Sequence, residues 1–181
     1  MRKLIKHIDY LFIPKLVIVL LFLSINILSS AQIAIVVNSN NPVSELSINE
    51  LKAIFLGKQV YFRQGENLIL LCDYKPDIDE FCAKVYGYSG KTMNKHWFQL
   101  IFSGTSANPP KKMNSVENLL NFISIQQNAI GYISVKNIPQ NVKGIKVLKI
   151  EGQLPGGKDY LLSDLGLPTS KDPKTLTLNM K

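Results

Sequence analysis

The stretch IAIVVNSNNPVSELSINELKAIFLG, residues 33–57, decides the expected fold. It opens with an apolar run from Ile33 to Val37, which is typical of a strand buried on both faces of a largely parallel sheet. A polar turn follows, and Ser47 and Glu50 then form a capping box that begins a helix, for which Gly57 supplies the stop. A strand that leads through a short turn into a capped helix predicts an α/β protein.

Similar segments continue along the chain. The sequence predicts further strands over residues 68–72, 130–133 and 145–150, and helices that begin at Asp77 and cover residues 91–102 and 115–126. Asp77 is expected to cap its own helix, with Glu80 in the third position. Residues 103–110 are expected to form a loop because Ser, Asn, Gly and Pro are frequent there. This order predicts one three-layer α/β domain over residues 32–160 and a tail over residues 161–181.

The first 31 residues are expected to form a secretory signal peptide. Basic residues precede an apolar run over residues 16–28, and Ser29 and Ala31 have the spacing of a signal-peptidase site. The run is shorter than the roughly 20 residues of a spanning helix, and Pro14 interrupts its upstream extension. An uncleaved membrane anchor is the alternative interpretation. We therefore predict a periplasmic protein that contacts the membrane only through this leader, if the leader is retained.

The charges of the chain give no sign of a nucleic-acid partner. The formal net charge is +8, but the leader carries four of the 21 basic residues and one of the 13 acidic residues, which leaves about +5. These charges are scattered, and only Lys111 and Lys112 are adjacent in the remainder. Binding to nucleic acid usually needs a concentrated basic face with stacking aromatic residues. We therefore expect no nucleic-acid partner.

The residues that could bind metal or catalyse a reaction are few. His96 is the single histidine outside the leader, and no cysteine is near it in sequence. Cys72 and Cys82 could form a disulfide in an oxidising compartment or remain two buried thiols, and the sequence leaves both open. No nucleophile, base and orienting group come together. We expect neither enzyme activity, nor a metal site, nor a cofactor.

Several segments, taken in order, resemble the phosphate-binding proteins of bacterial ABC transporters, and more closely the short proteins allied to them. They are IAIVVNSNNPV (33–43), LSINELKAIFLGK (46–58), KHWFQLIFSGTSANPPK (95–111), AIGYIS (129–134) and IEGQLP (150–155) followed by YLL (160–162). The stretch AIFLGK after a capped helix is the more specific signal. The resemblance implies one lobe of a type II periplasmic solute-binding protein, because about 150 residues are roughly enough for one lobe of the two-lobed relatives.

The resemblance also implies where an anion would bind. The full-length relatives hold phosphate through a segment resembling Arg-x-x-x-Ser-Gly-Thr, at a strand end and helix start. This chain has CDYKPDI there, residues 72–78. Free N–H groups and the helix dipole attract phosphate at such a position. Asp77 would occupy those N–H groups itself and repel a dianion, which is a departure from the family pattern.

Position in the sheet provides the remaining ligand candidates. Ligands of open α/β sheets lie beyond the carboxyl ends of the strands. The candidates belong to the turns after the first two strands and to the loop after residue 102, and they are Asn38, Ser39, Asn40, Asp73, Tyr74, Lys75, Ser103 and Thr105. Asn, Ser and Asp also favour turns for local hydrogen-bonding reasons, so a structural role is the alternative.

Two functions follow from these expectations. The first is a periplasmic solute-binding-protein-like domain that recognises a small phosphate-like anion without catalysis and serves a membrane transporter. The second is a single-lobe interaction module that binds a membrane receptor or sensor protein and takes no small ligand. The single lobe and the acidic Asp77 at the anion segment favour the second.

Overall fold

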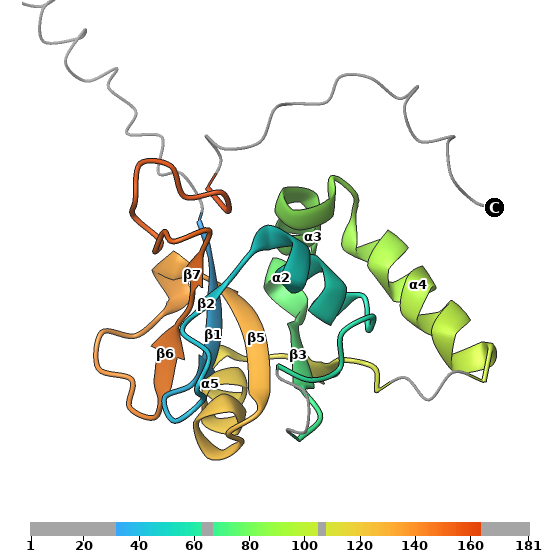
Figure 1. The fold of residues 1–181 in the computed structure, drawn as a ribbon, viewed down its shortest axis with the longest axis horizontal. Helices are drawn as coiled ribbons and strands as arrows, with labels where there is room; N and C mark the ends of the chain where they lie inside the picture. The colour runs from blue at the N-terminus through green and yellow to red at the C-terminus, as the bar shows by residue number, and fades with distance from the viewer. Residues whose placement is uncertain (1–31, 63–66, 105–107, 164–181) are drawn as a thin grey trace, which may run out of the picture.

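The computed structural model describes residues 32–62, 67–104 and 108–163. The predicted leader, Thr105 and the predicted tail from residue 164 onward lie outside the described residues. A five-stranded sheet lies at the centre, with the strand order β4-β3-β5-β1-β6 (Figure 1). Its strands are β1 Ile33–Asn38, β3 Leu70–Tyr74, β4 Lys111–Met113, β5 Ala129–Ser134 and β6 Ile145–Val147. A separate parallel pair joins β2 Glu45–Leu46 to β7 Lys149–Ile150.

Most strands of the sheet run in one direction, and the first strand runs against them. β3 pairs in parallel with β4 and with β5, whereas β1 pairs antiparallel with both β5 and β6. The predicted α/β fold is confirmed, but β1 does not run parallel to its neighbours as expected. All six residues of β1 are buried, and a strand covered on both faces is apolar throughout whichever way it runs.

Helices cover both faces of the sheet and complete three layers. They are α2 Ile48–Phe55, α3 Ile78–Tyr86, α4 Gly90–Phe102 and α5 Val116–Ile125, with short 3₁₀ turns η1 Lys75–Asp77 and η2 Val135–Asn137. The ring of Tyr132 on β5 stacks on Phe81 of α3, with centroids 3.9 Å apart. A side-chain atom added at the adjacent Gly131 would lie 3.0 Å from Leu119 of α5. Neighbouring residues of β5 therefore face α3 on one side and α5 on the other.

The helix predicted after the first strand forms as expected. The Ser47 hydroxyl accepts a hydrogen bond from the Glu50 N–H at 3.2 Å, and the Glu50 carboxylate accepts one from the Ser47 N–H at 2.8 Å. An N-cap of this kind contributes about 1 kcal/mol. Gly57 follows the helix with a φ of 71°, a left-handed conformation that glycine adopts without steric cost.

Several strand boundaries differ from the sequence-based expectation. The strand expected over residues 68–72 begins at Leu70 and continues through Tyr74. Residues 145–150 form two short strands that are separated by Leu148. β4 was not expected at all, because two of its three residues are lysines, and lysine is depleted in strands.

The start of α3 also differs. η1 precedes α3, so Asp77 stands at the N-cap position of α3 but makes no side-chain hydrogen bond to that helix. Its carboxylate instead accepts a hydrogen bond of 2.6 Å from the backbone N–H of Ser134, at the end of β5. The expectation that Asp77 caps its own helix is wrong, because the nearby strand end offers a buried donor.

α4 buries less of its surface than the sequence predicted. Met93 and Trp97 are buried, but Leu100 is half-buried and the side chain of Ile101 is 46% exposed. α4 packs mainly against α3 on the outside of the domain (Figure 1). A helix that packs against one other helix buries side chains along a narrow stripe. The stripe of buried side chains expected for α4 was therefore too wide.

The two cysteines are free thiols on opposite faces of the sheet. Cys72 lies beside Gly131 on the face covered by α5, and Cys82 lies on α3, which covers the other face. Both thiols are buried, and no disulfide joins them. Burial raises the pKa of each thiol to about 12.

The last described residues close the domain beside its first strand. Ile33 donates its N–H to the carbonyl of Leu162 at 3.0 Å, and the Tyr160 hydroxyl donates to the carbonyl of Ile33 at 2.7 Å. Leu162 and Ser163 are buried. The packed domain thus extends at least three residues past the expected boundary at residue 160. Within the described ranges, no helix has the length and apolar character needed to cross a membrane.

Candidate functional site

Three strands end together at one edge of the sheet, which we call the carboxyl edge. Because β3, β4 and β5 are parallel, their last residues, Tyr74, Met113 and Ser134, lie at this edge. An open groove of about 570 Å³ lies there, between the starts of α3 and α4 and the ends of β3 and β4. This carboxyl-edge groove is lined by Asp73, Lys75, Ile78, Asp79, Gly90, Lys91, Asn94, Lys112 and Asn114.

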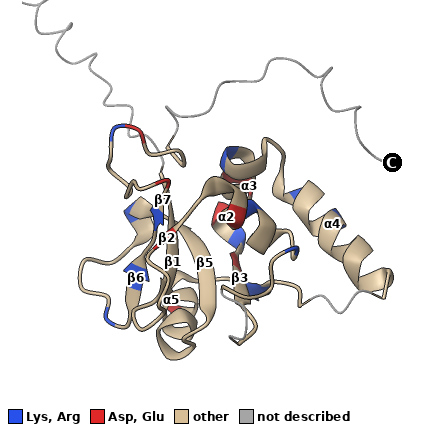
Figure 2. Cartoon of the chain, viewed as in Figure 1, with Lys and Arg blue, Asp and Glu red and all other residues tan. Residues whose placement is uncertain are grey.

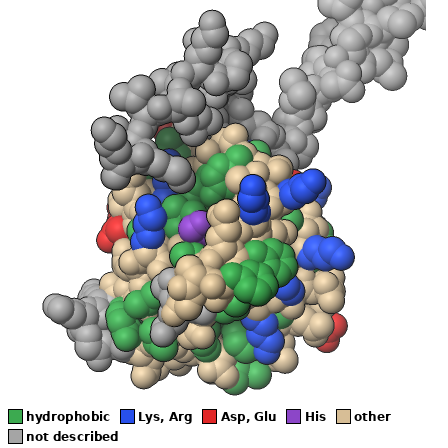
Figure 3. All heavy atoms as spheres, turned by 90° about the vertical axis from the view of Figure 1, so that its right-hand side faces the viewer, with side chains coloured by type: hydrophobic (Ala, Val, Ile, Leu, Met, Phe, Trp, Pro, Cys, Tyr) green, Lys and Arg blue, Asp and Glu red, His purple; other side chains and the backbone are tan. Residues whose placement is uncertain are grey.

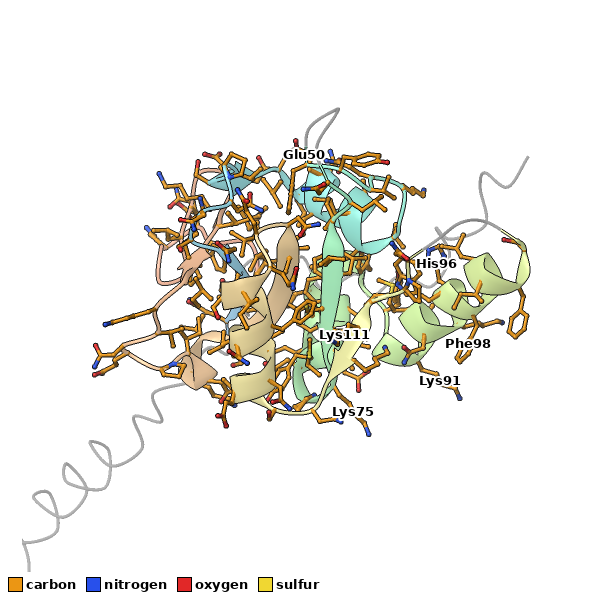
Figure 4. All side chains as sticks on the ribbon, turned by 90° about the horizontal axis from the view of Figure 1, so that it is seen from below. Glu50, Lys75, Lys91, His96, Phe98 and Lys111 are labelled. Atoms are coloured by element: carbon orange, nitrogen blue, oxygen red, sulfur yellow. The ribbon has the colours of Figure 1, made fainter. Side chains whose placement is uncertain are left out.

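Basic side chains from three separate elements surround the groove. Lys75 belongs to η1, Lys91 to the first turn of α4, and Lys112 to β4. Lys75 and Lys91 are exposed and extend from the same side of the molecule (Figure 4). Two acidic residues, Asp73 and Asp79, also line the groove, so its lysines outnumber its carboxylates by one.

Asp73 is buried at the floor of the groove and is held there by hydrogen bonds. Its carboxylate forms an ion pair with Lys112 and accepts a hydrogen bond from the Tyr132 hydroxyl. The Lys112 ammonium also donates to the Asn94 side chain of α4 at 2.7 Å. Burial, followed by the neighbouring Asp73, raises the pKa of the Tyr132 hydroxyl well above its usual range. The tyrosine therefore stays a donor at neutral pH, and the carboxylate of Asp73 is satisfied on both sides.

Two helices begin at the wall of the groove. The Asp79 carboxylate, in the first turn of α3, accepts a hydrogen bond of 2.8 Å from the N–H of Gly90, the first residue of α4. Ser89, at the N-cap of α4, makes no side-chain cap hydrogen bond. The partial positive charge at the N-terminal end of each helix adds to the field of the lysines and favours a bound anion.

Of the three ligand residues predicted after the second predicted strand, two line this groove and one does not. Asp73 and Lys75 are on its surface. Tyr74 lies between them in sequence, but its side chain is buried in the core. Strand alternation explains this arrangement, since Tyr74 points to the sheet face opposite to that of Asp73.

The residues after the first strand lie at the opposite edge of the sheet. β1 is antiparallel to β5, so Asn38, Ser39 and Asn40 are far from the carboxyl edge. The Asn38 amide donates to the carbonyls of Ile123 and Ser124 at 2.9 and 2.8 Å, at the end of α5. Its side-chain oxygen accepts from the N–H of Asn40 at 2.8 Å. Asn38 thus has a structural role, and these three residues do not join Asp73 and Lys75.

The loop candidates do not reach the groove either. Ser103 is the C-cap of α4, and its hydroxyl donates to the carbonyl of Leu100 at 2.8 Å. Gly90, at the groove, and Ser103 are at opposite ends of the 13-residue helix, which is about 20 Å long. Thr105 lies outside the described residues.

Sequence reasoning did not find most of the groove lining. Lys91, Asn94 and Lys112 were not candidates, because β4 was not predicted and the docking of α4 depends on tertiary packing. The adjacent lysines 111 and 112 were noticed only as a charge pair. Strand alternation separates them: Lys111 extends over the Phe122 ring of α5 at 4.3 Å, and Lys112 reaches the groove. Among the residues that the structure describes, no group of three or more His, Cys, Asp or Glu could hold a metal ion.

The fold resembles solved phosphate receptors. An ABC-type phosphate transport receptor from Vibrio cholerae matches 74% of this chain at a TM-score of 0.51 and 21% identity. A protein from Clostridium perfringens, assigned to a phosphate ABC transporter and crystallised with bound phosphate, matches 68% of this chain at a TM-score of 0.52 and 20% identity. PstS from Borrelia burgdorferi matches 74% of this chain at a TM-score of 0.51 and 13% identity.

These likenesses concern the fold and part of each relative. The chain covers 54%, 46% and 55% of the three proteins, which is about half of their length. No protein-family model matches the chain, and no curated protein matches it significantly. The predicted resemblance is therefore supported as a shared α/β fold with substrate-binding proteins of phosphate transporters.

Proposed function

We propose that this chain is a non-catalytic recognition domain that binds a small oxyanion such as phosphate in the carboxyl-edge groove. The observation that carries this proposal is the convergence of Lys75, Lys91 and Lys112 with the starts of α3 and α4 in one groove. Lysines and helix N-termini together stabilise negative charge. The resemblance to phosphate receptors agrees with the same class of ligand.

The acidic residues reduce the positive charge of the groove but do not cancel it, because three lysines line the groove with two carboxylates. Asp73 is already paired with Lys112 and Tyr132 at the floor, and Asp79 already accepts the Gly90 N–H. Asp77, the residue of the family segment that would repel a dianion, has its carboxylate on the Ser134 N–H and is not part of the groove lining. Lys75 and Lys91 remain exposed for a ligand.

The setting of this function is part of the proposal. We place the protein in the periplasm after export through residues 1–31, where it would deliver the anion to a membrane transporter. Two of the relatives named above are an ABC-type phosphate transport receptor and a protein of a phosphate ABC transporter with bound phosphate, and this chain matches about half of each. A second candidate, a single-lobe module that binds a protein partner, is favoured by the open shape of the groove.

Thermal unfolding with and without phosphate tests the proposal. Ligand at about a hundred times its dissociation constant stabilises the native state by about 2.7 kcal/mol, which is on the order of 5–10 °C in Tm for this size. Lys75→Gln with Lys91→Gln should remove the shift, whereas Lys143→Gln, an exposed lysine near the opposite sheet edge, should retain it. No shift with phosphate, sulfate or arsenate would reject anion binding and favour the protein-partner function.

A further inference from the structure

α4 carries a regular stripe of exposed side chains that has no described partner. Lys91, Lys95, Phe98 and Phe102 form this α4 stripe, and all four are exposed. The exposed fractions of Phe98 and Phe102 are 61% and 84%. At 100° per residue the four side chains fall within one narrow sector, directly opposite Met93 and Trp97, which attach the helix to the domain. Large aromatic side chains exposed together in this way mark an interaction surface.

The charge of α4 has a single sign. The helix contains lysines and no acidic residue, as Figure 2 shows by its blue and tan ribbon. The face of the molecule on that side carries hydrophobic side chains among lysines, with acidic side chains at its margins (Figure 3). Lys91 and Phe98 extend to one side of the helix and His96 to the other (Figure 4). His96 is tied to the domain, with Nε2 3.0 Å from the carbonyl of Leu56.

The spacing of the α4 stripe makes it complementary to itself. Successive members are four, three and four residues apart, which is the spacing of the seam in a coiled coil. When two such helices lie antiparallel, Lys91 of one copy faces Phe102 of the other, and Lys95 faces Phe98. Both pairs occur twice by symmetry, as a twofold interface requires. Each pair brings an ammonium group to an aromatic ring, and the lysine stems cover apolar surface.

We infer that two copies of this chain associate through the α4 stripe in an antiparallel, twofold-symmetric pair. In this pair the two α4 stripes pack against each other. Phe102 of one copy then lies next to Lys91 of the other copy, at the groove. A parallel pair would place lysines against lysines, so the sequence of the stripe selects the antiparallel arrangement. This inference does not depend on anion binding.

The pair should be weak and sensitive to salt. A helix of 13 residues is about 20 Å long, so one helix pair buries less than the roughly 1,200 Å² of a stable interface. Both copies are also positively charged, with about five net charges each outside the leader. Added salt screens that repulsion, so self-association should increase from low to moderate salt.

Sedimentation velocity over a range from micromolar to millimolar protein tests the inference. The unaltered chain should show a concentration-dependent monomer–dimer equilibrium. Phe98→Ala with Phe102→Ala should weaken it by at least about tenfold, because two central aromatic residues are lost and no new charge is introduced opposite the lysines. Ile125→Ala truncates an apolar residue of α5 that is 67% exposed and should leave the equilibrium unchanged. Since Trp97 is the single tryptophan, its fluorescence verifies that each variant is folded.

A crosslinking experiment tests the arrangement. Lys95→Cys and Phe98→Cys variants, mixed and oxidised, should form the mixed disulfide faster than either variant alone forms its own. The native thiols are buried and do not compete. A chain that stays monomeric at all concentrations would overturn the inference, and so would a dimer that persists in the double alanine variant. Binding to anionic lipid vesicles without self-association would assign the stripe to a membrane surface instead.

Discussion

The carboxylate of Asp77 holds the end of β5 by accepting a 2.6 Å hydrogen bond from the backbone N–H of Ser134. Asp77 belongs to η1 after β3, so this bond ties the segment that follows one strand to the end of its neighbour. Both residues are buried. A buried N–H group must find an acceptor in the protein, because water does not reach it.

Asp77→Ala should therefore destabilise the domain by about 1–3 kcal/mol, the cost of leaving a buried donor unsatisfied. Asp77→Asn keeps an acceptor oxygen and should therefore lose less of the free energy of unfolding. Urea unfolding measures both effects, with Asp159→Ala, an exposed aspartate, as the control. Equal losses for the Ala and Asn variants would show that charge, and not the acceptor, is what matters at this position.

Lys112→Ala should cost more stability than Lys111→Ala, although the two lysines are adjacent. Lys112 pairs with the buried Asp73, and its removal leaves that carboxylate with Tyr132 as its described partner, at a cost of about 1–3 kcal/mol. Lys111 lies over the Phe122 ring at the surface, an interaction of about 0.5–1 kcal/mol. Denaturant midpoints compare the two variants, and similar values would contradict the assigned role of Lys112.

Gly57→Ala should loosen the attachment of α4. The φ of Gly57 is 71°, and an added Cβ would lie 2.8 Å from the Trp97 ring. Gly87 has a φ of 77° with no atom within 4 Å of its Cβ position, so Gly87→Ala reports backbone strain alone. The loss of unfolding free energy for Gly57→Ala should exceed that for Gly87→Ala by about 1–3 kcal/mol, which is the usual cost of overpacking. A red shift of Trp97 fluorescence should accompany it, and identical losses would exclude a collision with the ring.

Stability should fall at alkaline pH because of the two buried thiols. A free thiol ionises near pH 9, whereas Cys72 and Cys82 ionise in the native state at about 12. Between these values the unfolded state loses its protons first, so the native state is progressively destabilised as the pH rises from 9 to 12. The expected slope is on the order of 1 kcal/mol per pH unit for each thiol. Unfolding between pH 8 and 10.5 measures it, and Cys82→Ala should show a shallower decline.

The same burial predicts unreactive cysteines. The native protein should react slowly with a thiol reagent at pH 8, because the thiolate is the reacting form and both sulfur atoms are enclosed. Two equivalents should react at once in denaturant. Fast reaction of either thiol in the native state would show that its side chain reaches solvent.

The features of this fold that could be predicted from the sequence are those determined by residues close together in the chain. The burial of Ile33–Val37 and the capping box of Ser47 and Glu50 depend on neighbouring residues, and both were correctly predicted. The direction of β1 was not predicted, because it depends on pairing with residues such as Ser134, which is far from β1 in the sequence. The strand at Lys111 was missed for the same reason, since its partner β3 supplies the hydrogen bonds and its own residues do not favour a strand.

The candidate groove was predicted only in part, because some of its residues are far apart in the sequence. Asp73 and Lys75 follow one another at a strand end, and the rule that ligands lie beyond strand ends found them. The rule placed Asn38 with them because it assumed parallel strands. Lys91 and Lys112 come from a helix and a strand whose positions are fixed by tertiary packing. No spacing in the sequence connects them to Asp73.

The pairing of Ile33 with both Ser134 and Leu162 has a kinetic consequence. β1 is the first strand of the sheet to be made, but its two neighbours in the sheet, β5 and β6, are synthesised much later. Contacts between residues so far apart in sequence form slowly, because a long loop must close before they contribute. In the nascent chain β1 therefore stays without its strand partners until almost the whole domain has been made. For a protein that we propose is exported, that delay would keep the chain unfolded long enough to cross a membrane.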